Sequence, residues 1–335
     1  MTARRLRASL KGWGGVGTML AVCVLAVGLV LLLPLVGTRG DGSTGIGGPG
    51  LAKASQAKDE ACGAHPEQLS PPPSADESGP AVKAIKKRGY VSVGVDQNSY
   101  RWGYRDPNTV GSDLEGFDID LAHEIARQII GDADAVRFHA IPTNQRIPAI
   151  KSGEVDMVVR TMTINCDRLK DVAFSDPYFT TGQQVLAPRA SDITGYDKSL
   201  TGKKICSAEG STANADLSAD KKSGRLPASA DISTTVPNQL DCLVKLQLGE
   251  VDAVVTDGAL AASQAAQDPT VELKGKPFTT EYYGVAMNKE AGDDLVRRVN
   301  QVLVDYRKSG WQTSYTKWLS QTLGANSASS QPSSS

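Results

Sequence analysis

Residues Gly153-Glu154-Val155-Asp156-Met157-Val158-Val159 recur later in the chain as Gly249-Glu250-Val251-Asp252-Ala253-Val254-Val255. Each copy follows a segment with helix-like apolar spacing, at 147–150 and at 242–246. Each copy also ends in a short apolar run suited to a buried parallel strand. The alternative explanation is that the recurrence arose by chance, because a Gly-x-x-Asp turn is common. We interpret the recurrence as a sign of two α/β units.

Other segments fit the same α/β pattern. Residues 91–95 alternate as a strand does, and Leu121, Ile125 and Ile129 recur at the spacing of one helix face. Residues 204–208 begin a second strand-then-helix unit, which continues into Gly210-Ser211-Thr212. Strands alternating with helices predict doubly wound sheets, in which ligands bind beyond the carboxyl ends of the strands.

Polar residues of opposite charge follow the two repeated strands. Arg160 and Arg168 come after the first copy, and Asp257 ends the second. A free amino acid carries a carboxylate and an ammonium, so its site needs Arg, hydroxyls or helix-start N–H groups, and a carboxylate. The structural alternatives are helix caps, a solvated Arg and a turn Asp. The residues that supply the binding set are Thr161, Thr163, Arg168, Ser211, Thr212 and Asp257.

Composition excludes some classes of function. The 335 residues have a formal net charge of -1, which argues against a nucleic-acid partner. The three histidines are scattered and the cysteines lack metal-ligand spacing, so we expect no metal and no cofactor. No phosphate-binding Gly-x-x-x-x-Gly-Lys-Ser/Thr loop and no nucleophile-base pair is present, so we do not expect an enzyme.

The two ends of the chain have compositions of their own. Residues 1–15 are basic, and 16–36 form an apolar run long enough to span a bilayer. We expect a membrane anchor with a cytoplasmic basic end; a cleaved signal peptide and lipidation at Cys23 are the alternatives. Residues 37–80, rich in Gly, Ser and Pro, are predicted to be a flexible linker, and 324–335 a disordered tail.

Four cysteines lie outside the apolar run. An even number in an exported chain favours two disulfides. Cys206 and Cys242 belong to a strand and a helix of one predicted βα unit, where they can approach closely, so we expect them to pair. The remaining pair would be Cys62 with Cys166.

The chain resembles the family 3 extracellular solute-binding proteins over roughly residues 82–323. The resemblance implies a two-lobed α/β fold of the periplasmic-binding-protein type II, with 81–180 and 285–323 in lobe 1 and 184–280 in lobe 2. Two crossover strands would form the hinge. The resemblance rests on Gly116-Phe117-Asp118, Thr161-Met162-Thr163 through Arg168 to Pro177-Tyr178, Gly210-Ser211-Thr212, Val251-Asp252-Ala253 to Asp257, and Gly310-Trp311 to Trp318-Leu319.

The same resemblance implies roles for single residues. Arg168, Thr163 and Thr212 would hold the ligand's α-carboxylate, Asp257 would take its amine, and Thr161 would line the pocket. The segment from Thr143 to Pro148 resembles that of glutamate/aspartate binders, in which an Arg meets the distal carboxylate; here that residue is Arg146.

Two further residues bear on the ligand. Asp96 stands where some acidic-ligand binders have a basic residue, so it either disfavours a second carboxylate or is engaged by Arg101 or Arg160. Glutamine, asparagine and aspartate therefore stay open beside glutamate. Of the aromatic residues Tyr100, Trp102 and Tyr104 near the first predicted strand, one is expected to cover the ligand, Tyr100 first; core packing is the alternative.

These features predict a monomeric binding protein on the extracytoplasmic face of the cell membrane. It would deliver a polar amino acid, glutamate first, to an ABC-type permease. The alternative is a sensor that docks on a signalling membrane protein. An enzyme on the same fold is the least favoured class.

Overall fold

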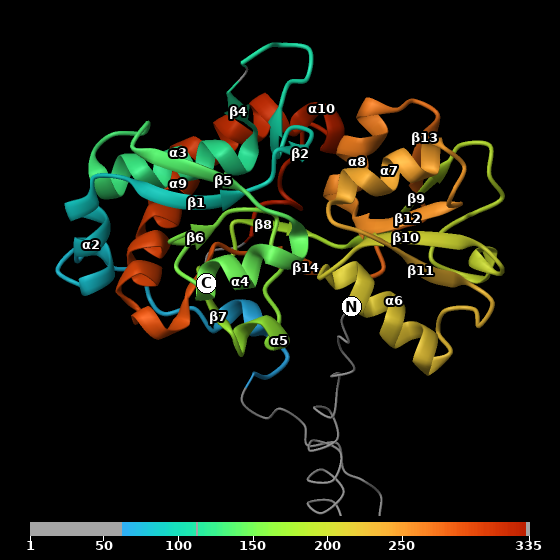
Figure 1. Ribbon diagram of the computed structural model, residues 1–335, viewed down its shortest axis with the longest axis horizontal. Helices are drawn as coiled ribbons and strands as arrows, with labels where there is room; N and C mark the ends of the chain where they lie inside the picture. Colours follow the sequence, from blue (N-terminus) through green and yellow to red (C-terminus); the bar gives the residue numbers. More distant parts are fainter. Residues whose placement is uncertain (1–61, 112, 333–335) are drawn as a thin grey trace, which may run out of the picture. The chain divides into compact units, whose positions relative to one another are not determined.

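The computed structural model describes residues 62–111 and 113–332, which form two α/β lobes (Figure 1). The α-helices are α2 (Pro80–Arg88), α3 (Phe117–Ile130), α4 (Arg146–Lys151), α5 (Cys166–Leu169), α6 (Thr212–Ser223), α7 (Gln239–Gln247), α8 (Gly258–Gln267), α9 (Asp294–Trp318) and α10 (Ser320–Leu323). Short 3-10 helices lie at η1 (Pro66–Gln68), η2 (Thr143–Gln145), η3 (Lys198–Leu200) and η4 (Lys289–Ala291).

Lobe 1 is built on a five-stranded sheet with the order β5-β1-β6-β15-β7. The first three strands are parallel and the last two pairings are antiparallel. Helices α2, α3 and α9 share a core with one face of the sheet, and α4 packs on the other face. The strands are β1 (Val91–Val95), β5 (Val136–Ala140), β6 (Met157–Val158), β15 (Ala286–Asn288) and β7 (Val172–Phe174).

Lobe 2 repeats this arrangement with the order β11-β10-β12-β9-β13. Again three parallel strands are followed by two antiparallel pairings. Helix α6 packs on one face, and α7 and α8 pack on the other (Figure 1). The strands are β11 (Asp231–Val236), β10 (Lys204–Ala208), β12 (Ala253–Asp257), β9 (Gln183–Pro188) and β13 (Val271–Lys274). The predicted α/β class is confirmed, but neither sheet is purely parallel, because the fourth strand of each, β15 or β9, runs antiparallel to its two neighbours.

The seven-residue recurrence marks the same turn in each lobe. Gly153 follows α4 and Gly249 follows α7, with φ of 74° and 70°. Only glycine adopts this left-handed backbone without a steric penalty. The apolar residues after each Asp then enter β6 and β12, whose neighbours in the sheets are β1 and β10.

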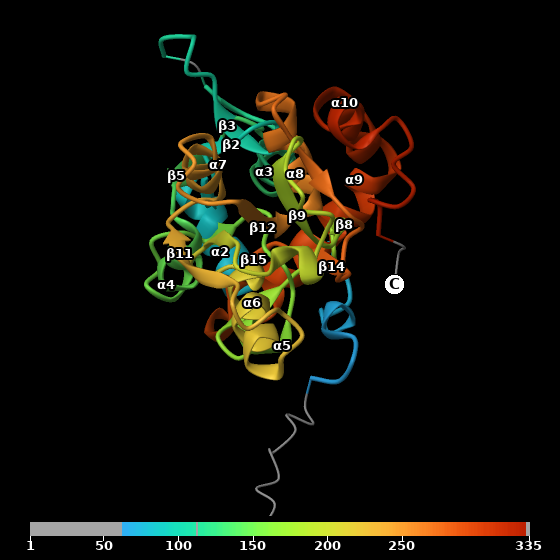
Figure 2. The same ribbon diagram turned by 90° about the vertical axis from the view of Figure 1, so that its right-hand side faces the viewer.

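Two crossover strands join the lobes. β8 (Phe179–Thr181) leads into lobe 2 and β14 (Glu281–Tyr283) leads back. They pair antiparallel and lie side by side in Figures 1 and 2. The aromatic rings of Phe179 and Tyr283 stack here, and Trp102 of lobe 1 packs edge-on against both. A small additional sheet in lobe 1 contains β2 (Asn98–Ser99), β3 (Gly103–Arg105) and β4 (Leu114–Glu115).

Part of the predicted linker is folded against lobe 1. We call residues 62–79 the strap. Within it, the Ser70 hydroxyl donates to the Phe174 carbonyl at 2.9 Å, and Asn300 of α9 donates to Ser70 and to the Pro71 carbonyl. Pro71 to Pro73 have no backbone N–H to donate, and the carbonyl oxygens of Pro71 and Pro72 accept from the α9 side chains of Asn300 and Arg297. The expectation of a flexible linker is therefore wrong for residues 62–80.

The end of the chain is also in contact with the fold. The amide of Thr180 in β8 donates to the Ser330 carbonyl at 2.8 Å, and the Tyr315 hydroxyl donates to the Gly324 carbonyl. Ser330 is buried. A disordered tail is thus the wrong expectation for 324–332, because these backbone groups find partners on the hinge and on α9.

Both expected disulfides are present. Cys206 of β10 joins Cys242 of α7, with a Cα–Cα distance of 5.6 Å, and Cys62 of the strap joins Cys166 at the start of α5, at 5.7 Å. The second disulfide ties the strap to the segment that carries Arg168.

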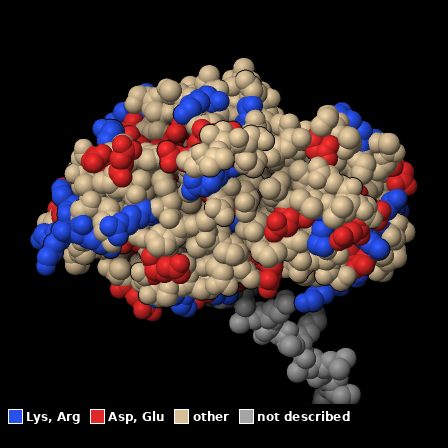
Figure 3. All heavy atoms as spheres, turned by 45° about the horizontal axis from the view of Figure 1, so that its top comes forward, with Lys and Arg blue, Asp and Glu red and all other residues tan. Residues whose placement is uncertain are grey.

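Charge on the described surface is mixed. On the face that Figure 3 presents, Lys and Arg side chains are interspersed with Asp and Glu. Within residues 62–111 and 113–332, none of the helices is long and apolar enough to cross a membrane. The predicted anchor at 16–36 lies outside these residues.

Candidate ligand-binding site

The candidate site lies where the carboxyl ends of the two sheets face each other. Lobe 1 contacts lobe 2 there through η2: the Thr143 amide donates to the Pro237 carbonyl at 3.1 Å, and the Thr143 hydroxyl donates to Gln239 at 3.2 Å. Asn144 donates to Glu209 at 3.0 Å. The lobes are therefore hydrogen-bonded to each other around the residues described below.

Arg168 extends from α5 into this interface. The Asn165 side chain caps α5 by accepting from the Arg168 amide. The Arg168 guanidinium donates to the Thr163 carbonyl at 2.7 Å and, across the lobes, to the Gly210 carbonyl at 3.1 Å. Burial lowers the pKa of Arg168, against the opposing effect of the acidic groups Glu281 and Asp257. Both hydrogen-bond partners are neutral carbonyls, so the positive charge has no carboxylate in direct contact.

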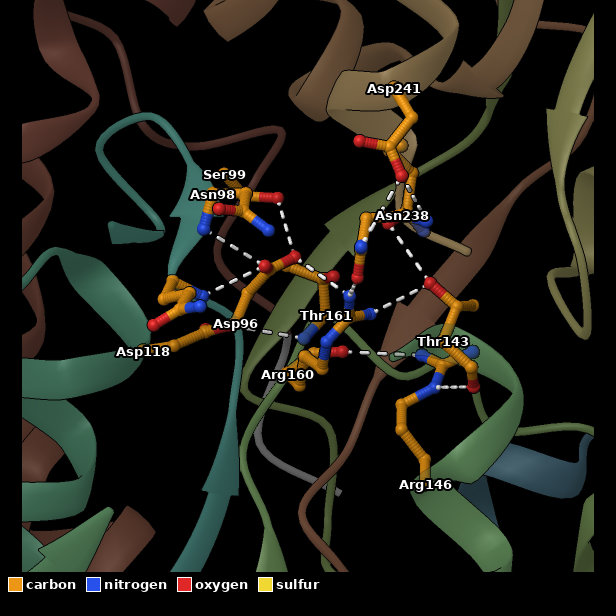
Figure 4. Close-up of polar contacts among 12 residues, drawn as sticks. Asp96, Asn98, Ser99, Asp118, Thr143, Arg146, Arg160, Thr161, Asn238 and Asp241 are labelled. Atoms are coloured by element: carbon orange, nitrogen blue, oxygen red, sulfur yellow. Dashed lines mark hydrogen bonds and ion pairs between the residues drawn. The ribbon is translucent and has the colours of Figure 1, made fainter. Parts of the chain in front are cut away.

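Arg146, the first residue of α4, is also a buried cation held by carbonyls. It donates to the carbonyl oxygens of Thr143, Arg160 and Gly210 at 2.9, 3.2 and 3.4 Å. Figure 4 shows its guanidinium beside Thr143 and Arg160. Burial, followed by repulsion from Arg168 and Arg160, places the pKa of Arg146 well below its usual value. The side-chain carboxylate of an acidic ligand, placed beside Arg146, would offset the repulsion among the three arginines.

Asp96 is engaged with Arg160. The Arg160 guanidinium lies 2.9 Å from Asp96 Oδ2, and both side chains are buried. Arg160 also donates to Thr143 and, across the lobes, to Asn238 at the start of α7 (Figure 4). Of the two partners considered for Asp96, Arg160 makes the contact. Arg101 donates instead to the Trp318 carbonyl and to Gln321.

Thr161 occupies a strained position between Asp118 and the cleft. Its φ is 41°, unusual for a β-branched residue, and its amide donates to Asp118 Oδ2 at 3.0 Å. The Tyr178 hydroxyl donates to the other oxygen of Asp118. Burial raises the pKa of Asp118 to about 7. Asp118 was not among the expected site residues, although it lies in the quoted Gly116-Phe117-Asp118 segment.

Asp257 ends β12 and faces the hinge. Its Oδ2 accepts from the Tyr283 hydroxyl at 2.6 Å, and its Oδ1 accepts from Gln183 at 2.5 Å. Burial and then the Glu281 carboxylate raise the pKa of Asp257 to about 8. Gln183 and Glu281 were missed by the sequence analysis, which placed the crossover segments at the hinge and assigned them no site role.

The hydroxyl residues divide into two groups. Thr163 and Thr212 donate to Glu281 Oε2 at 2.5 and 3.1 Å, so both lie beside the acidic residues. Ser211 caps α6: its hydroxyl accepts from the Asn214 amide and donates to the Ala208 carbonyl. The Ser211 hydroxyl therefore donates its hydrogen within its own turn.

Tyr100 lies in a different space from the charged residues. Its ring packs edge-on against Tyr104, and it lines a cavity of about 460 Å³ together with Leu240 and Gln267 of lobe 2. None of the three arginines Arg146, Arg160 and Arg168 lines this cavity.

A second cavity reaches the acidic side of the site. It has a volume of about 530 Å³ and runs from His65 and Glu67 of the strap to Thr163, Thr212 and Glu281. The strap therefore forms one wall of an approach to these residues. Among the described residues, no group of three or more acidic, His or Cys side chains is arranged to hold a metal ion.

Two lobes joined by paired crossover strands, with cations and carboxylates buried between them, define a protein of the ligand-binding, lobe-closing class. Residues 91–321 match the family described as bacterial extracellular solute-binding proteins, family 3, and the chain belongs to this family. The family consists of solute-binding proteins, not enzymes, as expected.

Three relatives illustrate the similarity. The chain is 32% identical over 239 residues to the ABC transporter glutamine-binding protein GlnH of Bacillus subtilis, covering 71% of this chain and 84% of the relative. It is 29% identical to the glutamate-binding protein GluB of Corynebacterium efficiens, covering 75% and 84%. Among solved structures, an ancestral arginine-binding protein bound to glutamine has a TM-score of 0.61, 34% identity, and coverage of 69% of this chain and 98% of that one.

Proposed function

We propose that this chain is an extracytoplasmic receptor that closes its two lobes around a free amino acid. One observation carries the proposal: Arg168 and Asp257 are both buried between the lobes, and among the described residues neither forms an ion pair. Burial disfavours the charged forms of both groups: it lowers the pKa of Arg168 and raises the pKa of Asp257, so a ligand that supplies the counter-charges would stabilise the charged forms. The carboxylate and ammonium of an amino acid do so.

Glutamate is the ligand that we favour. Arg146 is a second buried cation whose hydrogen-bond partners are all carbonyls. A distal carboxylate would pair with it. Asp96 does not oppose this pairing directly, because its charge is compensated by Arg160. The relative from Corynebacterium efficiens, a glutamate-binding protein, supports this choice.

Glutamine is the second candidate. The relative from Bacillus subtilis is a glutamine-binding protein, and the similar ancestral structure is bound to glutamine. A carbamoyl group could accept from Arg146 through its oxygen, although it would leave the positive charge uncompensated.

Calorimetric titration of the purified chain with all twenty amino acids tests the proposal. We expect glutamate to bind most tightly. A ligand at 100 times its dissociation constant raises the free energy of unfolding by about 2.7 kcal/mol, so thermal shifts give an independent check. If the chain is folded and titration detects no binding of any of the twenty amino acids, the proposed function is contradicted.

Arg146→Ala separates the two candidate ligands. It should weaken glutamate much more than glutamine, because only glutamate then leaves a desolvated negative charge unpaired. Arg189→Ala, which removes a surface cation from lobe 2, is the matched control. Equal losses of affinity for glutamate and glutamine would show that Arg146 does not distinguish the side chains of the two ligands.

We further propose delivery of the amino acid to an ABC-type permease. The Bacillus subtilis relative is named as an ABC transporter component, which supports a transport role. A sensor that docks on a signalling membrane protein remains the alternative. Co-purification of the liganded chain with a permease tests the choice.

A further inference from the structure

Helix α5, which carries Arg168, is a single turn of four residues. The side chain of Leu169 packs against the apolar cluster beside β7, and the Lys289 ammonium donates to the Leu169 carbonyl at 2.8 Å. The first residue of α5 is Cys166, which the disulfide joins to Cys62 of the strap. A covalent attachment to the strap therefore lies two residues from Arg168.

The strap itself is fixed to α9. The Ser74 amide donates to the Arg297 carbonyl at 2.9 Å, and the Asn300 side chain donates to the Ser70 hydroxyl at 2.7 Å. Helix α9 has 25 residues and contributes to the main apolar core of lobe 1. The strap thus connects a long helix of the lobe 1 core to the first residue of α5.

Close packing does not fill the space between the strap and α5. A cavity of about 410 Å³ lies there, lined by Leu69 of the strap, by Leu169 of α5 and by the two cysteines of the disulfide. The cavity of about 530 Å³ is lined by His65 of the strap and by Asn165, the residue before α5. With two cavities at this junction, the disulfide, more than packing, transmits the position of the strap to α5.

The two disulfides differ in their access to solvent. Cys206 and Cys242 are fully buried, whereas Cys62 and Cys166 are partly exposed. A dithiol reductant can therefore reach the strap disulfide selectively. One of its thiolates attacks a sulfur of the pair and the other then completes the exchange, so the dithiol leaves as a cyclic disulfide. The two cysteines gain two electrons and two protons and become thiols.

We propose that the Cys62–Cys166 disulfide holds Arg168 in its ligand-binding position, so that reduction of this disulfide weakens amino-acid binding. Cys166 is then a positioning residue, which acts through Arg168 without touching the ligand. This inference rests on the proposed function and deepens it. When the disulfide is open, α5 and the Arg168 guanidinium gain freedom, and the ligand must order them again, which lowers affinity.

The test uses the full chain with Cys62→Ser and Cys166→Ser introduced together. The probes are L-glutamate and L-glutamine, measured by calorimetry at a temperature at which every chain is folded. We expect the double variant to bind the tighter probe roughly 3- to 10-fold more weakly, as for one side chain that must be immobilised on binding. The wild-type chain treated with a dithiol should show the same loss, and reoxidation should restore the affinity. Alkylation and peptide mapping should find label on Cys62 and Cys166 only.

Arg168→Lys shows whether the disulfide acts through Arg168. Lysine carries a compact charge on a flexible stem, so its contact with a carboxylate depends less on a fixed orientation. Removal of the disulfide from the Arg168→Lys variant should therefore weaken binding less than it does in the chain that retains Arg168. Losses of equal size in the two chains would indicate a general loosening of lobe 1 and would overturn the assignment.

Ser70→Ala is the matched control on the strap. It removes the hydrogen bonds to Phe174 and Asn300 and keeps the disulfide. We expect it to lower the free energy of unfolding and to leave amino-acid affinity unchanged, because the covalent attachment to α5 is intact. A loss of affinity equal to that of the double cysteine variant would show that the disulfide has no particular role.

A strap that only gates the approach to the site makes a different kinetic prediction. The strap forms one wall of that approach, so its release would raise the association and dissociation rates together and leave affinity unchanged. Loss of the position of Arg168 should instead raise mainly the dissociation rate. Stopped-flow measurements separate the two roles, and equal changes in both rates would overturn the positioning role.

The remaining outcomes are also decisive. If the oxidised wild-type chain binds no amino acid, the proposed function fails and this inference fails with it. If the chain binds an amino acid with the same affinity before and after reduction of the strap disulfide, only this inference fails. If the double cysteine variant does not fold, reduction of the wild-type chain after folding supplies the same comparison.

Discussion

Asp156 and Asp252 make the same pair of hydrogen bonds in the two lobes. The Asp156 carboxylate accepts from the Ser92 amide at 2.7 Å, and its own amide donates to the Ser92 carbonyl at 2.9 Å. Asp252 does the same with Lys204, at 2.7 and 2.8 Å. Each Asp thereby attaches the start of the repeated strand, β6 or β12, to the neighbouring strand, β1 or β10. The sequence recurrence thus has a structural cause in both lobes.

Asp252→Ala should lower the free energy of unfolding by about 1 kcal/mol, because it removes one hydrogen bond at the partly solvated start of β10. Urea unfolding measures the change. Glu250→Ala removes a neighbouring carboxylate that contacts only surface Lys245, and should have little effect. Equal stabilities of Asp252→Ala and the wild type would contradict the proposed attachment.

Arg168→Ala should abolish measurable amino-acid binding. It leaves the ligand's carboxylate unpaired in a closed site, at a cost of roughly 2–5 kcal/mol. Arg168→Lys keeps the charge but loses the two-pronged geometry, so we expect an intermediate affinity. Calorimetry measures both, and Lys151→Ala, a surface substitution in lobe 1, is the control. Wild-type affinity in Arg168→Ala would refute the carboxylate assignment.

Asp96→Asn should destabilise the fold and leave ligand selectivity unchanged. Arg160 is fully buried, and without Asp96 its charge has no ionic partner, a loss of about 3 kcal/mol. Thermal unfolding and the ratio of glutamate to glutamine affinity are the two measurements. Asp192→Asn breaks an exposed ion pair with Lys203 and should be nearly neutral. A selectivity change without loss of stability would place Asp96 against the ligand.

The stability of the fold should fall as pH rises from the reference pKa of Asp257, 3.8, to its raised pKa of about 8. In this window the folded protein holds a proton that the unfolded chain has released, so raising the pH favours unfolding. Asp118, with a pKa raised to about 7, adds to the same decline. Asp257→Asn should therefore reduce the difference in stability between about pH 5 and about pH 8. Denaturant unfolding at the two pH values tests this, and identical differences in variant and wild type would argue against the shift.

A chain that begins at Ala81 should be less stable than one that begins at Cys62. It lacks the Cys62–Cys166 disulfide, which spans 104 residues and contributes about 2–4 kcal/mol. It also leaves the buried Asn300 amide without Ser70 and Pro71. Cys62→Ser with Cys166→Ser removes only the disulfide, so its loss should be smaller than that of the truncation. Equal stability of all three chains would show that the strap contributes nothing.

Local patterns in the amino-acid sequence predicted the α/β class and two α/β units, and the resemblance to family 3 solute-binding proteins implied the two-lobed, hinged arrangement. The repeated Gly-Glu-Val-Asp segments, the alternation at 91–95 and the helix spacing at 121–129 are local patterns, and each reports burial on one face of one element. The partners of Cys206 and Cys242 could be predicted because strand and helix neighbours of one βα unit approach each other closely. The pairing of Cys62 with Cys166 was inferred as the remaining one.

The tertiary structure decided which polar groups meet. Gln183 at the start of β9 and Glu281 at the start of β14 are 98 residues apart, yet the Gln183 amide donates to both Glu281 and Asp257. Arg160 was weighed as a partner for Asp96 from the sequence, and only the fold chose it over Arg101. The strap looked like a linker because proline-rich polar sequence has no apolar periodicity, whereas its attachment depends on α9 and on β7. Such contacts join segments remote in sequence, so no local pattern encodes them, and burial makes their pairing costly to leave unmet.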